Sequence, residues 1–260
     1  MKALHIAATG MRAQELNVEV ISNNVANMRT TGYKRQRADF QDLLYQNLRR
    51  MGTNSSANGT IVPTGVQIGS GVKTASTARI MSQGNLSQTG KELDVAVRGE
   101  GFFQIQLPDG GEAYTRDGSF ERDANGQLVT IDGYAVAPGI VIPQDARDVT
   151  ISADGQVQVL DANNAIQQLG QLQLARFVNK SGLEAIGDNL FLETESSGAA
   201  VIGNPADAGF GDLMQNHLEM ANVEAVGEIS DLIAAQRAYE MNSRIIKAAD
   251  EMSATTSNLR

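Results

Sequence analysis

The chain has 260 residues, of which 42% are hydrophobic and 20% are charged, and its formal net charge is −9. This hydrophobic content is typical of globular proteins and excludes disorder throughout, and the acidic balance argues against nucleic acid as the main partner. The chain has no cysteine and only two histidines, which excludes disulfides and thiolate metal sites and argues against a zinc site. No run approaches ~18 continuous apolar residues, and no cleavable signal peptide is evident, so we expect no direct membrane insertion.

Residues 2–27 are predicted to form a helix with one apolar stripe. Leu4, Met11, Val18 and Val25 recur every seven residues, and Ile21 belongs to the second row of the same stripe. Such a repeat is typical of a coiled-coil seam, although a helix lying on the body of its own domain shows it too. The helix is predicted to end in polar turn formers and a glycine, which include Asn23, Asn24, Asn27 and Gly32.

Residues 31–80 are predicted to be an extended linker region. A basic run at 33–37 is followed by residues 40–50, which are compatible with a short helix. Residues 51–75 are rich in Gly, Ser, Asn and Thr and have too few large apolar side chains for a core of their own. We therefore expect a linker, or an excursion that orders against something else.

From about residue 86 to residue 200 the hydrophobic period changes to two. Many short alternating runs separated by turn residues predict an antiparallel β domain, a sandwich or an irregular barrel, over residues 81–220. Asx-Gly pairs separate the runs, and we expect type I′ hairpin turns there, with positive φ at both residues. The pairs are Asp109-Gly110, Asp117-Gly118, Asn125-Gly126, Asp132-Gly133 and Asp154-Gly155.

Residues 221–260 are predicted to form a second, longer helix capped by Asn222. About thirty helical residues give a rod of roughly 45 Å, which is long for a helix inside one domain, so its stripe needs a partner. This region is acidic on balance and residues 1–50 are basic, which suits pairing of the two ends, although solvated helix faces explain the charges equally well. The apolar stripe contains Ile229, Leu232, Ile233, Tyr239 and Ile246.

The order of these segments predicts an α+β fold. The terminal helical regions, residues 1–30 and 221–260, are expected to pair as a coiled-coil-like domain, within one chain or between chains. The antiparallel all-β domain and the extended linker region are inserted between them.

The sequence contains no recognisable set of catalytic residues. Ser70 and Lys73 match the S-x-x-K pattern, but its companion motifs in acyl-serine enzymes are absent. The stretch 99–101 lacks the third glycine of a dinucleotide turn, and 123–126 lacks the ligands of a calcium loop. We therefore predict no enzymatic activity, no cofactor and no metal, and a role in interaction instead.

Several short motifs follow one another in order along nearly the whole chain. At the N-terminus these are Ile21-Ser22-Asn23-Asn24-Val25-Ala26-Asn27 and Thr31-Gly32-Tyr33-Lys34, and at the C-terminus the run 232–240, which contains Gln236, Arg237 and Tyr239. Both ends resemble the signatures of the bacterial flagellar basal-body rod and hook proteins, and residues 93–103, 114–118 and 126–129 are similar to the β-domain core of that family. The segments 42–46 and 63–72 look most like the distal rod group. Proximal rod and hook-type axial proteins are the alternatives.

This resemblance implies a structural subunit of the bacterial flagellum basal body. Such proteins assemble helically into the hollow axial shaft that crosses the periplasm and joins the proximal rod to the hook, with the terminal helices as the polymer core and the β domain outside. The implied partners are further copies of the chain, proximal rod proteins, the hook protein, the P and L ring proteins and the flagellar type III export apparatus.

The resemblance also assigns roles to two sets of residues. The apolar stripes of the two helices become the predicted self-assembly seam, and residues 46–65 correspond to the rod-specific stretch of the family. A remote alternative from another class is an exported glycan-binding or hydrolytic β domain carried on a helical stalk.

Overall fold

The computed structural model describes residues 2–51, 64–162 and 165–258, which divide into two compact units. Unit 1 comprises residues 1–25, 36–78 and 225–260, and unit 2 comprises residues 26–35 and 79–224. The architecture is α+β, with a helix at each end of a β-rich middle, as predicted. The predicted linker region, residues 31–80, is divided between the two units.

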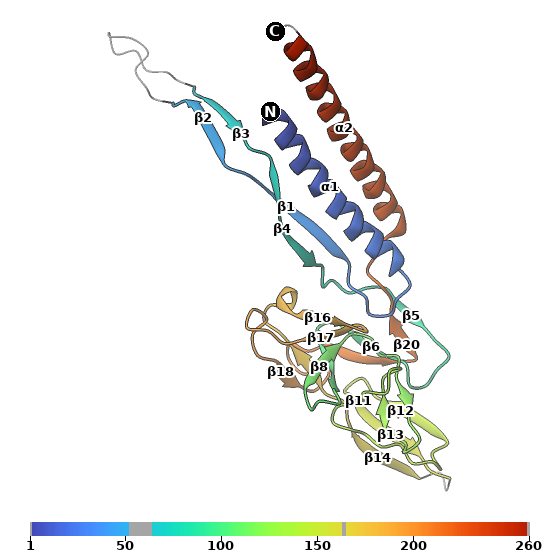
Figure 1. Ribbon diagram of the computed structural model, residues 1–260. Coiled ribbons are helices and arrows are strands. Elements are labelled where there is room, and N and C mark those ends of the chain that lie inside the picture. The colour runs from blue at the N-terminus through green and yellow to red at the C-terminus, as the bar shows by residue number, and fades with distance from the viewer. Residues whose placement is uncertain (1, 52–63, 163–164, 259–260) are drawn as a thin grey trace. The chain divides into compact units, whose positions relative to one another are not determined.

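Unit 1 contains two long helices, α1 (Lys2–Ala26) and α2 (Ala225–Asn258). They lie side by side and run in opposite directions (Figure 1). The predicted N-cap of α2 is wrong, because the helix begins at Ala225 and the Asn222 side chain is used elsewhere. Its amide accepts a hydrogen bond from the Arg35 backbone N–H at 2.7 Å and donates one to the Ile80 carbonyl at 2.8 Å.

Four strands of the linker region form two antiparallel ribbons in place of the short helix predicted at residues 40–50. The strands are β1 (Gln36–Asp42), β2 (Tyr45–Arg49), β3 (Val66–Gly69) and β4 (Val72–Arg79), paired as β1–β4 and β2–β3. Backbone hydrogen bonds from Leu43 N to Gly71 O (2.9 Å) and from Ser70 N to Leu44 O (3.2 Å) continue the pairing between the two ribbons. This cross-strand bonding overrides the local helical preference, which is a weak signal by itself. Of the expected rod-specific stretch, residues 52–63 lie outside the described residues.

Unit 2 is a set of short antiparallel strands. The main sheet has the order β16-β17-β8-β7-β11-β10-β9, and β15 pairs with both β7 and β18. A second sheet has the order β12-β13-β14. Two further pairs are β19 with β6 and β20 with β5. The bounds are β5 (Leu86–Gln88), β6 (Val95–Arg98), β7 (Phe102–Gln106), β8 (Glu112–Thr115), β9 (Glu121–Arg122), β10 (Leu128–Val129), β11 (Ala135–Val136), β12 (Asp148–Ile151), β13 (Gln156–Leu160), β14 (Ile166–Gln171), β15 (Leu174–Arg176), β16 (Glu184–Gly187), β17 (Leu190–Leu192), β18 (Val201–Gly203), β19 (Asp212–Gln215) and β20 (His217–Glu219), with a 3₁₀ turn at Lys180–Gly182.

The hydrophobic core of unit 2 follows the alternation seen in the sequence. Phe103 and Ile105 of β7 are completely buried, and the Phe103 ring meets Phe120 edge to face at 5.0 Å between centroids. On the other side of β7, Phe102 packs in a second cluster with Tyr114, Phe177 and Phe191. The period of two therefore places successive side chains of one strand in two separate clusters.

The predicted type I′ turns at the Asx-Gly pairs are wrong. Only the glycine has positive φ in four of the pairs (Gly110, Gly126, Gly133 and Gly155), and Gly118 is not among the positive-φ residues. At residues 123–126, Gly126 N donates to Asp123 O at 3.0 Å and the Asp123 carboxylate accepts from Asn125 N at 2.8 Å. The Asx side chain thus stabilises a turn that ends on a left-handed glycine. A two-residue turn with both residues at positive φ does occur at Asp188-Asn189, between β16 and β17.

Candidate assembly interface

The facing sides of α1 and α2 carry small and polar residues. Asn24 Nδ2 donates to Glu228 Oε2 at 3.1 Å, and a Cβ added to Gly10 would lie 2.9 Å from Asn242 Nδ2. Gly10 and Asn24 are 14 residues apart along α1, and so are Glu228 and Asn242 along α2. The two contacts therefore belong to one antiparallel register, in which small and polar side chains let the backbones approach.

Asn24 links three elements of unit 1. Its side-chain amide is almost completely buried. Besides Glu228 of α2, it binds both backbone groups of Gln36 at the start of β1, through Nδ2 to the carbonyl at 2.8 Å and through Oδ1 from the N–H at 2.9 Å. On the same helix, Thr9 Oγ1 accepts from Val72 N of β4 at 3.3 Å. These bonds attach the first ribbon to α1.

The large aliphatic residues of α2 point mainly away from this contact. Val226 is 73% exposed, and Ile229, Ile233, Met241 and Ile245 are each about half exposed. These residues recur at steps of three, four and eight, so they form an apolar row along the helix. A row of this length on one face is a feature of binding surfaces more than of monomer surfaces.

The structure divides the predicted seam residues between two faces. Ile229, Ile233 and Tyr239 are exposed, whereas Leu232 and Ile246 are half-buried. On α1, Ile21 is buried, and the remaining predicted seam residues are half-buried: Leu4, Met11, Val18 and Val25. Unit 1 alone therefore covers only part of the predicted seam.

The ribbon β2–β3 exposes a second group of apolar side chains. Leu44 is 86% exposed, and the other exposed large apolar residues of this region are Tyr45, Leu48, Met51, Val66 and Ile68. An isolated two-stranded ribbon is at best marginally stable in water. An exposed apolar surface of this kind is typical of binding sites.

The family-motif residues serve different structural purposes. Gly32 is buried, has a φ of 70° and donates its N–H to the Glu219 carbonyl at 2.7 Å within unit 2. Asn27 accepts the backbone N–H of Thr30 at 3.0 Å in the turn after α1. Asn23, Gln236 and Arg237 are exposed on the helices of unit 1.

Unit 2 contains a buried ionic network that the sequence reading missed. Glu219 Oε1 accepts from Lys34 Nζ at 2.6 Å, and its Oε2 accepts from Arg116 Nε at 2.9 Å. Burial lowers the pKa of Lys34 below its usual value, and the negative charge of Glu219 opposes that shift. Lys34 and Arg116 both lie in polar motifs, so nothing in the sequence signals that they are buried. Once buried, they need a counter-charge, which Glu219 supplies.

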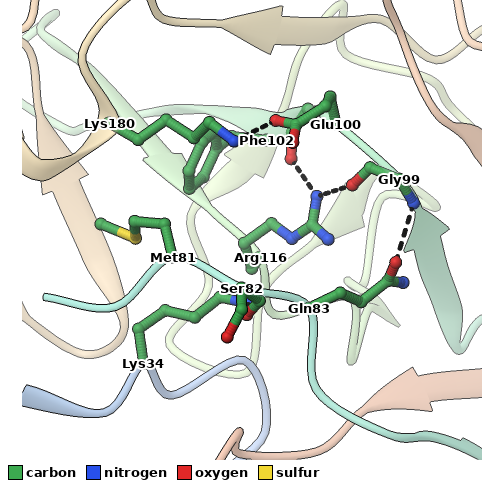
Figure 2. A pocket seen from close by; sticks show the side chains of 10 residues that line it. Lys34, Met81, Ser82, Gln83, Gly99, Glu100, Phe102, Arg116 and Lys180 are labelled. Carbon is green, nitrogen blue, oxygen red and sulfur yellow. Dashed lines mark hydrogen bonds and ion pairs between the residues drawn. The ribbon is translucent and has the colours of Figure 1, made fainter.

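A pocket of about 260 Å³ lies beside this network (Figure 2). Its polar walls are already bonded within the protein. The Arg116 guanidinium donates to the Gly99 carbonyl at 2.9 Å, to the Gly101 carbonyl and to the Val97 carbonyl at 3.3 Å, in addition to Glu219. Figure 2 also shows the Lys180 amine paired with the Glu100 carboxylate.

The described residues offer no group of three or more His, Cys, Asp or Glu side chains that could hold a metal ion. Over their described lengths, neither α1 nor α2 has a stretch apolar enough to span a bilayer.

Comparison with known proteins identifies relatives over the full length. Three family models match: "Flagella basal body rod protein" over residues 4–34, "Flagellar hook protein FlgE/F/G D1 domain" over 96–159, and "Flagellar basal body rod FlgEFG protein C-terminal" over 214–259. Flagellar basal-body rod protein FlgG of Caulobacter vibrioides is 59% identical and covers 100% of both chains. The FlgG proteins of Borreliella burgdorferi and Bacillus subtilis are 48% and 39% identical, each over 100% of this chain and 99% of the relative.

Among solved structures, the chain is similar to Helicobacter pylori flagellar hook protein FlgE2. The identity is 14%, the TM-score is 0.25, and the similarity covers 72% of this chain and 43% of that chain. A TM-score this low does not establish a shared fold.

Proposed function

The chain belongs to the flagellar basal-body rod protein family of FlgG, and on that premise we propose that it is a structural subunit of the distal rod. The observation that carries this proposal is the 59% identity to a FlgG protein over the whole length of both chains. The proximal rod and hook-type proteins are the alternatives within the family. The full-length matches named FlgG favour the distal rod.

In this proposal the subunits polymerise helically, and the two terminal helices form a coiled-coil-like core around a central channel. The exposed row on α2 supports this arrangement, because Val226, Ile229 and Ile233 have no cover within the described part of unit 1. Copies of the chain would bury this row and the apolar side chains of the β2–β3 ribbon, which overlaps the rod-specific stretch. Burial of such side chains contributes roughly 1.5–3 kcal/mol each.

The remaining partners follow from the position of a distal rod. The polymer would meet proximal rod proteins at one end and the hook protein at the other, and the P and L ring proteins would surround it in the periplasm. The subunits would reach that position through the flagellar type III export apparatus. A chain without cysteine is compatible with a location outside the cytoplasm.

An assembly experiment tests the proposal. We expect the double variant Ile229→Asp/Ile233→Asp to lose polymer formation, measured by light scattering and negative-stain electron microscopy of purified protein. The matched control is Ile131→Asp, which changes an isoleucine of unit 2 that is 68% exposed. Normal filaments from the double variant, or equal loss in the control, would contradict the proposed interface.

The pocket beside Glu219 gives no support to the alternative of an exported enzyme on a helical stalk, because the cations in its wall are paired with carboxylates of unit 2.

A further inference from the structure

Three segments of unit 2 that are distant in sequence meet around the Glu219 carboxylate. Oε1 accepts from Lys34 Nζ at 2.6 Å and from Gly84 N at 2.8 Å. Oε2 accepts from Arg116 Nε at 2.9 Å. Lys34 and Glu219 are separated by 185 residues, and Arg116 and Glu219 by 103. Residues from the beginning, the middle and the end of unit 2 thus share one carboxylate.

The backbone around Glu219 joins the same segments. The last segment, residues 217–222, pairs with β5 through β20, and Met220 N donates to Asn85 O at 2.9 Å. Its Asn222 side chain binds Arg35 N at 2.7 Å and the Ser82 carbonyl at 3.0 Å. Residues 217–222 therefore complete a structure whose other parts precede them in the chain.

The charges make this completion obligatory. The side chains of Lys34, Arg116 and Glu219 are at most 5% exposed. Without Glu219 the site would bury two cations with no carboxylate, which is far less favourable than leaving them in water. Apart from β5, which pairs with β20, the strands of unit 2 find their partners outside residues 217–222. The two cations, however, cannot both be buried with a counter-charge before Glu219 is in place.

We propose that Glu219 is the closing residue of unit 2: residues 217–222 dock after the rest of the β structure has formed, and the ionic network locks that last step. Because α2 begins at Ala225, three residues after Asn222, docking also fixes the chain just before the helix starts. Unit 2 then becomes fully stable only when almost all of the chain that precedes α2 is present.

Folding kinetics of full-length variants test this order. The chain has no tryptophan and five tyrosines, so the background Tyr45→Phe/Tyr239→Phe restricts tyrosine fluorescence to unit 2. In this background we expect Glu219→Gln to raise the unfolding equilibrium constant on the order of 100- to 1,000-fold, since removal of one partner leaves buried charges uncompensated. If residues 217–222 dock after the folding transition state, this change should appear in the unfolding rate and the folding rate should be unchanged.

The matched control is Glu100→Gln, which makes the same chemical change in the exposed pair with Lys180 beside the same pocket. We expect a change below about fivefold for this control. Lys34→Met is the second test variant, and it decides the question should Glu219→Gln fail to fold. It removes the ammonium that donates to Glu219 and to the Ser82 carbonyl, so we expect a smaller loss of stability that again appears in the unfolding rate and not in the folding rate. A slower folding rate in the variants would show that the network forms early, and unchanged stability would show that it locks nothing. Either result overturns the proposal.

Discussion

Replacement of Gly10 by alanine should lower the free energy of unfolding in the natural sequence and raise it in the Asn242→Ala background. Gly10 lies within α1 and its φ is not positive, so alanine fits the backbone there. In an unobstructed helix the exchange is expected to stabilise the protein by about 1 kcal/mol. Here the added Cβ would lie 2.9 Å from Asn242 Nδ2, which is closer than real Cβ contacts, and 3.1 Å from its Oδ1, which is tight.

The magnitude follows from these two opposing effects. Overpacking of a tight contact costs typically 1–3 kcal/mol, and part of it is relieved because the Asn242 side chain can rotate. We therefore expect Gly10→Ala to lower the free energy of unfolding by about 1 kcal/mol in the natural sequence. In the Asn242→Ala background the obstruction is gone, and the same exchange should raise it by about 1 kcal/mol, which gives a coupling of about 2 kcal/mol.

Urea unfolding followed by far-UV circular dichroism provides the assay, because α1 and α2 supply nearly all the described helix. Gly90→Ala is the control, since its Cβ would meet nothing within 4 Å. Equal effects of Gly10→Ala in both backgrounds would refute the close approach of α1 to α2 at Asn242, and with it the register inferred from Asn24 and Glu228.

Three further outcomes are expected. Asn24→Ala removes hydrogen bonds to Gln36 and Glu228 and should destabilise unit 1 by about 2–4 kcal/mol in urea unfolding, more than the exposed Asn23→Ala. Phe103→Ala should lower the unfolding free energy of unit 2 by about 3–5 kcal/mol, measured by tyrosine fluorescence, because the ring is fully buried against Phe120. Burial raises the pKa of Tyr114 from 10.0 to about 12, so the folded state holds the proton more tightly than the unfolded state does. The free energy of unfolding should therefore fall as the pH rises from about 10 to about 12, and Tyr114→Phe should remove that part of its pH dependence.

The helices of unit 1 could be predicted from the sequence because their signal is long and periodic. The seven-residue repeat of Leu4, Met11 and Val18 located α1 to within a residue at each end. The same pattern did not show which face of α2 meets α1. The contact uses Glu228 and Asn242, and polar residues do not register in a hydrophobic repeat.

The errors in the β region came from local signals that tertiary structure overrode. Residues 40–50 have no strong turn former and were compatible with a helix, but from Leu43 to Arg49 they pair with strand partners 17 to 28 residues away. Asx-Gly pairs mark a turn correctly without specifying its type. At Asn125-Gly126 the Asp123 carboxylate accepts from the backbone N–H groups of Asn125 and Gln127, and only Gly126 is left-handed.

The ionic network was hidden for a different reason. Lys34 and Arg116 were visible as parts of motifs, but their common partner Glu219 lies 185 and 103 residues away. Separations of this size along the sequence do not reveal that the three side chains lie in contact.

The unequal lengths of the two helices give the helical pair a direction. In the register defined by Asn24 with Glu228 and Gly10 with Asn242, residue 2 of α1 lies level with residue 250 of α2. Since α2 continues to Asn258, about eight residues, or ~12 Å, project beyond the start of α1. The two ends of the pair therefore differ: at one end the last residues of α2 lie beyond α1, and at the other the two helices end level. A copy of the chain that binds at the first end meets a single helix, and one that binds at the second end meets both helices.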